Sequence, residues 1–194
     1  MSLIKFLICI FLLTFNNISF SNEINDRDLF ETKSLQDKGN FYWLNIGSGL
    51  TLSDSSTLGF GSVLSLSHEH ERRLYSLRFL GSNELNLFEK PSLYLLDLGL
   101  LYGYMYRLGN NAFSISSGVS LIGGNKKGKL INSEDFTDEY EEINYVTIGL
   151  PLELQALYIP FKYFGLGITF FGNLNNEKSY YGSMLTFQFG KLNN

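Results

Sequence analysis

Residues 144–192 alternate between bulky apolar residues and small or polar residues at every second position. The alternation falls into three runs, at residues 145–157, 163–173 and 179–190. In the first run, valine, isoleucine and leucine alternate with threonine, glycine, proline, glutamate and glutamine. Successive side chains of a β-strand point to opposite sides, so a period of two with one apolar face indicates a strand. The chain is therefore predicted to end in three strands.

The same alternation recurs from residue 41 onward and predicts eight strands in all. They are residues 41–53, 57–68, 72–81, 93–107, 112–122, 145–157, 163–173 and 179–190. Each is long enough to cross a membrane as a tilted strand of about 9–11 residues. No helical pattern interrupts them. The predicted fold is therefore all-β, an eight-stranded antiparallel up-and-down transmembrane β-barrel formed by residues 41–194.

The two faces of these strands differ in size as well as polarity. One face carries residues such as Leu44, Phe60 and Leu98, and the other carries mainly glycine, serine and a few charged residues. An eight-stranded barrel has room inside only for packed side chains or one small ligand. Bulky residues from every strand would overpack that space. We therefore expect the apolar face to look towards lipid and the small, polar face to look inward.

The connections and the aromatic residues predict an orientation. Short connections at residues 69–71, 108–111 and 158–162 contrast with longer ones at 82–91 and 123–144. Outer-membrane barrels have short periplasmic turns and longer outside loops, so both chain ends are expected in the periplasm. Aromatic rings are expected at headgroup level. The girdle predicted at the periplasmic end consists of Tyr42, Tyr75, Tyr104, Tyr106, Phe113, Phe164, Phe187 and Phe189.

The first 21 residues have the pattern of a secretory signal peptide. Lys5 precedes a short apolar run, and Ser19 and Ser21 supply the small residues of a cleavage site. The run is too short to span a bilayer as a helix. Residues 22–40 are then expected to form a periplasmic N-terminal segment.

Removal of this signal peptide limits the chemistry of the mature chain. It takes away Cys9, the only cysteine, which excludes a disulfide or a cysteine-ligated metal, and no cofactor is expected. The loss of Lys5 changes the formal charge from −4 to −5, which disfavours nucleic acid as a partner. The bacterial outer membrane is the expected location.

Several charged residues are expected inside the barrel. Arg78 and Asp97 share a face of neighbouring strands and would lie directly opposite each other if paired positions sum to 175. Arg72, Arg107 and Glu153 are expected nearer the periplasmic end. A charge inside a narrow barrel must be paired, because its desolvation is costly. The prediction is a salt-bridge network that plugs the lumen, and the alternative is a gated pore or proton path.

His68 and His70 are expected in a solvated periplasmic turn beside Glu69 and Glu71. A His-x-His pair can ligate a metal or act as a base, but the sequence offers no obvious third ligand. We therefore predict no metal site and no catalytic residue. An enzyme that modifies lipid at the outer rim would need a histidine at the other end. That enzyme is the first alternative, and a soluble lipocalin-like carrier is the second.

The stretch 123–144 is expected to be an outside loop and the main functional surface. It carries Lys126, Lys127 and Lys129, followed by an acidic run that includes Glu134 and Asp135. The lysines could contact lipopolysaccharide phosphates, and the acidic half could bind a cation or a partner. The expected role is structural or surface-interactive and non-enzymatic. Expected partners are outer-membrane lipid and lipopolysaccharide, with the protein a monomer.

Residues 148–192 also resemble the C-terminal part of small outer-membrane barrel proteins of Bacteroidetes. The resemblance is carried by Pro151-Leu152-Glu153, Pro160-Phe161-Lys162, Gly165-Leu166-Gly167, Gly172-Asn173-Leu174-Asn175 and Phe189-Gly190-Lys191. It implies an eight-stranded barrel in the outer membrane, inserted by the barrel-assembly machinery, more than it implies an activity. Many such barrels end on an aromatic residue, whereas this chain continues past Phe189 to Asn194.

Overall fold

The structure, a computed structural model, describes residues 39–53, 58–85, 89–90, 93–134 and 137–193. The predicted signal peptide and nearly all of the predicted segment 22–40 lie outside the described residues. No helix in the described part of the chain is long and apolar enough to cross a membrane.

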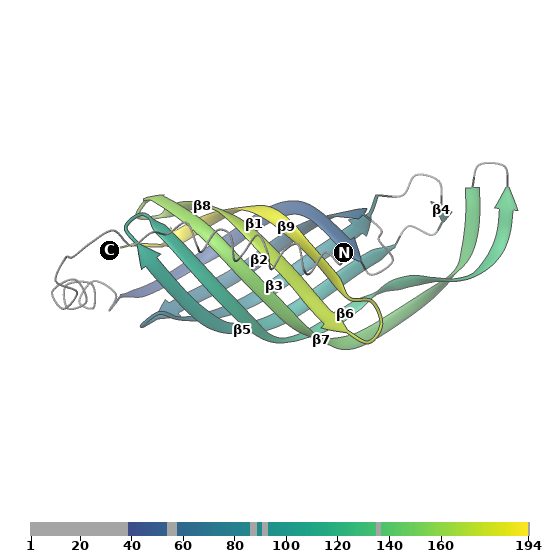
Figure 1. Ribbon diagram of the computed structural model, residues 1–194, viewed down its shortest axis with the longest axis horizontal. Helices are drawn as coiled ribbons and strands as arrows, with labels where there is room; N and C mark the ends of the chain where they lie inside the picture. Colours follow the sequence, from purple (N-terminus) through teal and green to yellow (C-terminus); the bar gives the residue numbers. More distant parts are fainter. Residues whose placement is uncertain (1–38, 54–57, 86–88, 91–92, 135–136, 194) are drawn as a thin grey trace, which may run out of the picture. The chain divides into compact units, whose positions relative to one another are not determined.

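Eight long strands form one closed antiparallel barrel (Figure 1). The strands are β1 (Asn40–Ser53), β2 (Leu58–His70), β3 (Arg73–Glu84), β5 (Tyr94–Leu108), β6 (Asn111–Glu134), β7 (Thr137–Phe161), β8 (Phe164–Asn175) and β9 (Tyr180–Lys191). Each pairs with the next along the chain, and β1 pairs with β9 to close the sheet. A two-residue strand, β4 (Glu89–Lys90), lies parallel to β7. The predicted eight-stranded antiparallel barrel is confirmed.

The apolar face of the strands is on the outside, as predicted. Buried and exposed residues alternate without interruption along β2. On the outer surface, leucine and valine side chains such as Leu100, Val119 and Val146 are 62%, 60% and 73% exposed. Serine, asparagine, glutamine and threonine side chains are buried inside, together with Arg78 and Asp97. The barrel thus has apolar side chains on its outer surface and many polar side chains inside, which is the reverse of a soluble protein.

The lumen also contains two apolar clusters that the sequence pattern did not predict. We call the end with the short β2–β3, β5–β6 and β7–β8 turns the turn end. The opposite end, from which the long β6–β7 hairpin extends, is called the hairpin end. Near the turn end lie Phe41, Trp43, Leu74, Met105, Ala112, Leu157, Ile159 and Leu192. Towards the hairpin end lie Val63, Leu80, Leu95, Ile122, Tyr145, Phe171, Tyr180 and Met184. The buried polar residues therefore share the lumen with two groups of packed apolar side chains.

The β2–β3 turn differs from its prediction. β2 continues to His70, and Glu71 and Arg72 form the turn with φ angles of 50° and 67°. Positive φ at both central residues gives a two-residue hairpin the twist that matches its strands. Arg72 is therefore exposed at the turn, and its predicted place in the lumen was wrong.

The predicted outside loop at residues 123–144 is also wrong, because most of it is strand. β6 and β7 remain paired from Gly124 and Tyr145 out to Glu134 and Thr137, with register shifts around Leu130. Figure 1 shows this pair extending beyond the rest of the barrel. We call residues 125–134 and 137–144 the β6–β7 arm. Its charges suggested a loop, but antiparallel pairing satisfies the backbone groups whatever the side-chain charge.

Pro151 interrupts the pairing of β6 with β7 in the barrel wall. Paired positions occur at Ser117 with Leu152 and at Ser120 with Gly149, with none between them. Proline has no N–H to donate to a neighbouring strand. The Ser117 hydroxyl instead donates to the Pro151 carbonyl oxygen at 2.8 Å. Local side-chain bonding thus substitutes for part of the missing ladder.

Opposite this interruption, Gly118 allows β6 to approach β5 closely. A Cβ at position 118 would lie 1.9 Å from the Leu100 carbonyl oxygen, whereas at Gly123 it would meet nothing within 4 Å. We expect Gly118→Ala to destabilise the barrel by about 1–3 kcal/mol, because the backbone must move to admit the methyl group. The midpoint temperature of the heat-induced change in gel mobility measures this. Gly123→Ala is the matched control, and an equal loss in both variants would contradict the close-approach argument.

Candidate functional site

A buried ion-pair network crosses the lumen. Arg78 on β3 donates from Nη2 to Asp97 Oδ2 on β5 at 2.9 Å and from Nη1 to Glu153 Oε2 on β7 at 3.2 Å. The Arg78 and Asp97 side chains are 1% and 0% exposed. Glu153 belongs to β7, which is separated from β3 by β5 and β6 in the sheet. The guanidinium group therefore connects distant strands through the barrel interior.

The register between β3 and β5 differs from the predicted one by two residues. Arg78 lies opposite Gly99, and Asp97 lies opposite Leu80. The expectation that Arg78 and Asp97 face each other directly was wrong. The ion pair still forms, because both residues point inward and the long arginine side chain reaches diagonally.

Three further residues on the inner face extend the network. The Tyr180 hydroxyl and the Asn173 amide nitrogen both donate to Asp97 Oδ2, the latter at 2.8 Å. The Gln155 amide nitrogen donates to Glu153 Oε1. The period of two places all three on the inner face, so their position could be predicted but not their partners. Together with Arg78 they hold β3, β5, β7, β8 and β9 in one hydrogen-bonded group.

A second ion pair lies at the turn end. The Arg107 Nε donates to both carboxylate oxygens of Glu69, at 3.0 and 3.2 Å. Its Nη1 donates to the Leu192 carbonyl oxygen at 2.7 Å, and its Cζ lies 4.3 Å from the Phe41 ring centroid. Glu69 is 1% exposed, so its predicted place in a solvated turn was wrong. Arg107 thereby anchors the C-terminal residues inside the barrel mouth.

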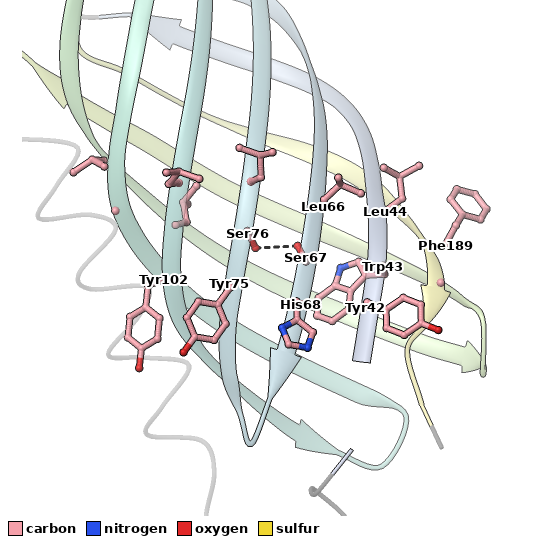
Figure 2. A pocket seen from close by; sticks show the side chains of 16 residues that line it. Tyr42, Trp43, Leu44, Leu66, Ser67, His68, Tyr75, Ser76, Tyr102 and Phe189 are labelled. Atoms are coloured by element: carbon pink, nitrogen blue, oxygen red, sulfur yellow. Dashed lines mark hydrogen bonds between the residues drawn. The ribbon is translucent and has the colours of Figure 1, made fainter. Parts of the chain in front are cut away.

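The aromatic residues predicted for the girdle all lie on the outer face towards the turn end. Seven of the eight are exposed and Phe164 is half-buried; its ring centroid lies 5.6 Å from that of Phe189. His68 and Tyr102 extend this group, with the Tyr75 ring centroid 6.4 Å from that of His68 and 5.3 Å from that of Tyr102. Figure 2 shows Tyr102, Tyr75 and His68 beside one another on neighbouring strands. A row of rings therefore follows this end of the barrel.

The two histidines lie in β2 and not in a turn. Their ring centroids are 6.5 Å apart, and His70 Nδ1 lies 2.5 Å from Asn40 Oδ1. Among the residues that the structure describes, no three histidine, cysteine, aspartate or glutamate side chains are grouped so as to hold a metal ion.

Of the lysines predicted as a loop surface, two form ion pairs and one is exposed. Lys126 Nζ lies 2.7 Å from Glu177 in the β8–β9 connection, and Lys127 Nζ lies 3.5 Å from Glu84 at the end of β3. Lys129 is exposed on the arm. Glu134 is the last residue of β6, and Asp135 lies outside the described residues.

A further charged group, Lys178, lies beside Glu84 and these ion pairs at the rim of the hairpin end. Burial lowers the pKa of the Lys178 ammonium below its ordinary value; Glu84 opposes the shift and Lys127 adds to it. The Glu84 side chain is 4% exposed. Much of the local lysine charge is thus used to bind the arm and the β8–β9 connection to the barrel.

The described barrel shares its fold with solved outer-membrane β-barrels. Neisserial surface protein A is 12% identical, with 78% of this chain and 98% of that chain covered and a TM-score of 0.60. The N-terminal β-barrel domain of Pseudomonas aeruginosa OprF is 14% identical, with 80% and 98% covered and a TM-score of 0.50. Ail, the attachment invasion locus protein of Yersinia pestis, is 10% identical, with 78% and 97% covered and a TM-score of 0.52.

The TM-scores establish a shared fold, but identities of 10–14% do not establish a shared activity. No protein-family model and no curated protein matches the chain. The resemblance to Bacteroidetes barrels therefore stays a prediction, and the class that the fold defines is the eight-stranded outer-membrane type of β-barrel.

The Arg78 network makes a quantitative prediction about stability. We expect Arg78→Met to lower the free energy of unfolding by about 3–5 kcal/mol, because two buried carboxylates lose their cation. Unfolding in urea, followed by the fluorescence of Trp43, the only tryptophan, measures this. A triple variant, Arg78→Met with Asp97→Asn and Glu153→Gln, should recover much of the loss. Equal destabilisation of both variants would show that lost packing, and not unpaired charge, is responsible.

Proposed function

We propose that this protein resides in the bacterial outer membrane as an integral barrel with a structural or surface-interactive role and no enzymatic activity. The observation that carries the proposal is the polarity of the barrel. Its exterior is covered with exposed apolar side chains, and four charged residues of its strands, Glu69, Arg78, Asp97 and Glu153, are buried inside. Soluble monomers rarely expose apolar patches larger than a few hundred Å². A bilayer is the surrounding that stabilises such an exterior, and a soluble lipocalin-like carrier would need the opposite polarity.

The turn end is proposed to face the periplasm and the arm to face outward. Short turns on one side and longer excursions on the other are the usual asymmetry of these barrels. The arm is the largest excursion, with β6 and β7 of 24 and 25 residues against 12 to 15 for the other long strands. Two structural neighbours are named a surface protein and an attachment invasion locus protein. This favours a role at the cell surface.

The arm is the proposed interaction surface. Leu130 and Ile131 are 53% and 66% exposed on it, next to the exposed Lys129. Exposed apolar side chains beside a cation suit contact with lipopolysaccharide or with a partner protein. The buried ion pairs and apolar clusters in turn support a plugged lumen through which no solute passes. A lipid-modifying enzyme at the outer rim receives no support, because both histidines lie at the turn end.

The membrane assignment is tested by a charge on the outer face. We expect Leu152→Arg, in the middle of the barrel part of β7, to cost about 2–4 kcal/mol of unfolding free energy in phospholipid vesicles. Leu152 is 51% exposed, so the cost would come from lipid and not from crowding. Tyr158→Arg, on the same face of β7 but at the turn end, is the control and should cost about 0–1 kcal/mol. Equal costs at both depths would contradict a bilayer around the barrel.

The orientation is tested with single cysteines in a chain whose Cys9 is replaced by serine. We expect Lys129→Cys, on the arm, to react in intact cells with a membrane-impermeant maleimide. Lys162→Cys, in the β7–β8 turn, should react only after the outer membrane is permeabilised. Labelling is read by mass shift on a gel, and unboiled samples should migrate faster if the barrel has closed. The reverse labelling pattern would mean that the arm faces the periplasm.

A further inference from the structure

A groove of about 920 Å³ is present in the barrel wall towards the turn end (Figure 2). Its sides are formed by outward-facing apolar residues of β1, β2, β3, β5, β6 and β9, among them Leu66, Leu100, Val119 and Phe189. The volume falls in the range of sites that hold one small molecule, about 300–1,000 Å³.

The inward-facing residues behind the groove explain why it is apolar. Ser67, Ser76 and Gly118 line it from the inner face of their strands, together with the larger Trp43 and Leu101. The Ser67 and Ser76 hydroxyls hydrogen-bond to each other at 2.9 Å (Figure 2). Because these hydroxyls satisfy each other inside the barrel, they present no polar group to the groove.

The turn-end border of the groove is a row of rings with polar atoms. Tyr42, His68, Tyr75 and Tyr102 line this border on adjacent strands (Figure 2). Amphipathic rings of this kind sit at the boundary between acyl chains and headgroups. The row therefore marks the depth at which a lipid changes from apolar to polar.

An arginine and a histidine follow directly beyond the rings. Arg73 is the next outward residue after Tyr75 on β3, and His70 is the next after His68 on β2; the two face each other in register. Both are exposed, and Glu71 in the adjoining turn is the acidic neighbour. Arginine binds phosphate oxygens through two parallel N–H donors. Apolar groove, rings and cation thus follow the same order as acyl chain, glycerol ester and phosphate.

We propose that this groove binds one phospholipid of the periplasmic leaflet, with an acyl chain along the groove and its phosphate at Arg73 and His70. The inference rests on the proposed function, since it needs the barrel to lie in a bilayer with its turn end towards the periplasm. It adds a defined lipid site to a surface otherwise covered by interchangeable lipids. The charge complementarity at Arg73 selects an anionic phosphate over a neutral apolar ligand.

Native mass spectrometry of the detergent-purified protein with added 1-palmitoyl-2-oleoyl-phosphatidylglycerol tests the site. We expect one retained lipid per barrel. Val119→Trp, which fills the groove, and Arg73→Gln, which removes the phosphate partner, should each lower retention by about tenfold. Val146→Trp and Lys162→Gln are the matched controls, because they place the same changes on the outer face or at the turn end but away from the groove. Both should retain lipid like the unchanged protein.

The outcomes separate the lipid site from the membrane proposal. Equal retention by all four variants would show only non-specific lipid and would overturn the site. Displacement of the phospholipid by purified lipid A would overturn the choice of occupant. The heat-dependent mobility shift is recorded on each preparation of the unchanged protein. If no shift is seen, both proposals fail; a normal shift with unselective lipid retention contradicts the groove alone.

Discussion

The structure depends on enclosing charge in a closed sheet. Arg78, Asp97 and Glu153 are almost fully shielded from solvent, and one guanidinium group forms ion pairs with two carboxylates. A pair of this kind survives burial only when hydrogen bonds satisfy the remaining lone pairs. Tyr180, Asn173 and Gln155 supply such bonds from three different strands, while Asp97 Oδ1 and Arg78 Nε have no hydrogen-bond partner among the described residues. The network joins β3, β5, β7, β8 and β9 across the lumen, so it forms only when the sheet has curled into a barrel.

The inverted polarity of the wall is what made the fold predictable from sequence. An eight-stranded barrel cannot hold bulky residues from every strand, so the period of two determined both the strands and their outward face. The register between β3 and β5 could not be predicted in the same way. A shift of two residues between β3 and β5 keeps every side chain on its face, and the hydrophobic pattern cannot distinguish paired positions that sum to 175 from those that sum to 177. Only a connection as short as a two-residue turn fixes the register by itself.

The remaining differences also have physical causes. Residues such as Glu69 and Arg72 are both charged and close to a turn, so polarity alone cannot tell which of them is inside. The backbone decides: Arg72 takes a positive φ in the turn, while Glu69 stays in β2 and reaches Arg107. The sequence pattern did not predict the apolar clusters of the lumen, because Leu74, Leu80 and Met105 occupy inner positions that the pattern assigns to small or polar residues. The many charged residues of the arm likewise led to the prediction of a loop where β6 and β7 continue as strands.

The two ends of the barrel are stabilised in different ways, and this bears on how the arm can act. At the turn end, Arg107 joins Glu69, Phe41 and the Leu192 carbonyl group in a largely buried cluster. At the hairpin end, the Lys126–Glu177 bridge is 41% and 35% exposed, and exposed ion pairs contribute about 0–1 kcal/mol. The Lys127–Glu84 bridge is more buried, with side chains 18% and 4% exposed, so this bridge and the backbone pairing of β6 with β7 together set the direction of the arm. An arm held by backbone pairing can exchange its side-chain partners for an external ligand without loss of the barrel, as an interaction surface requires.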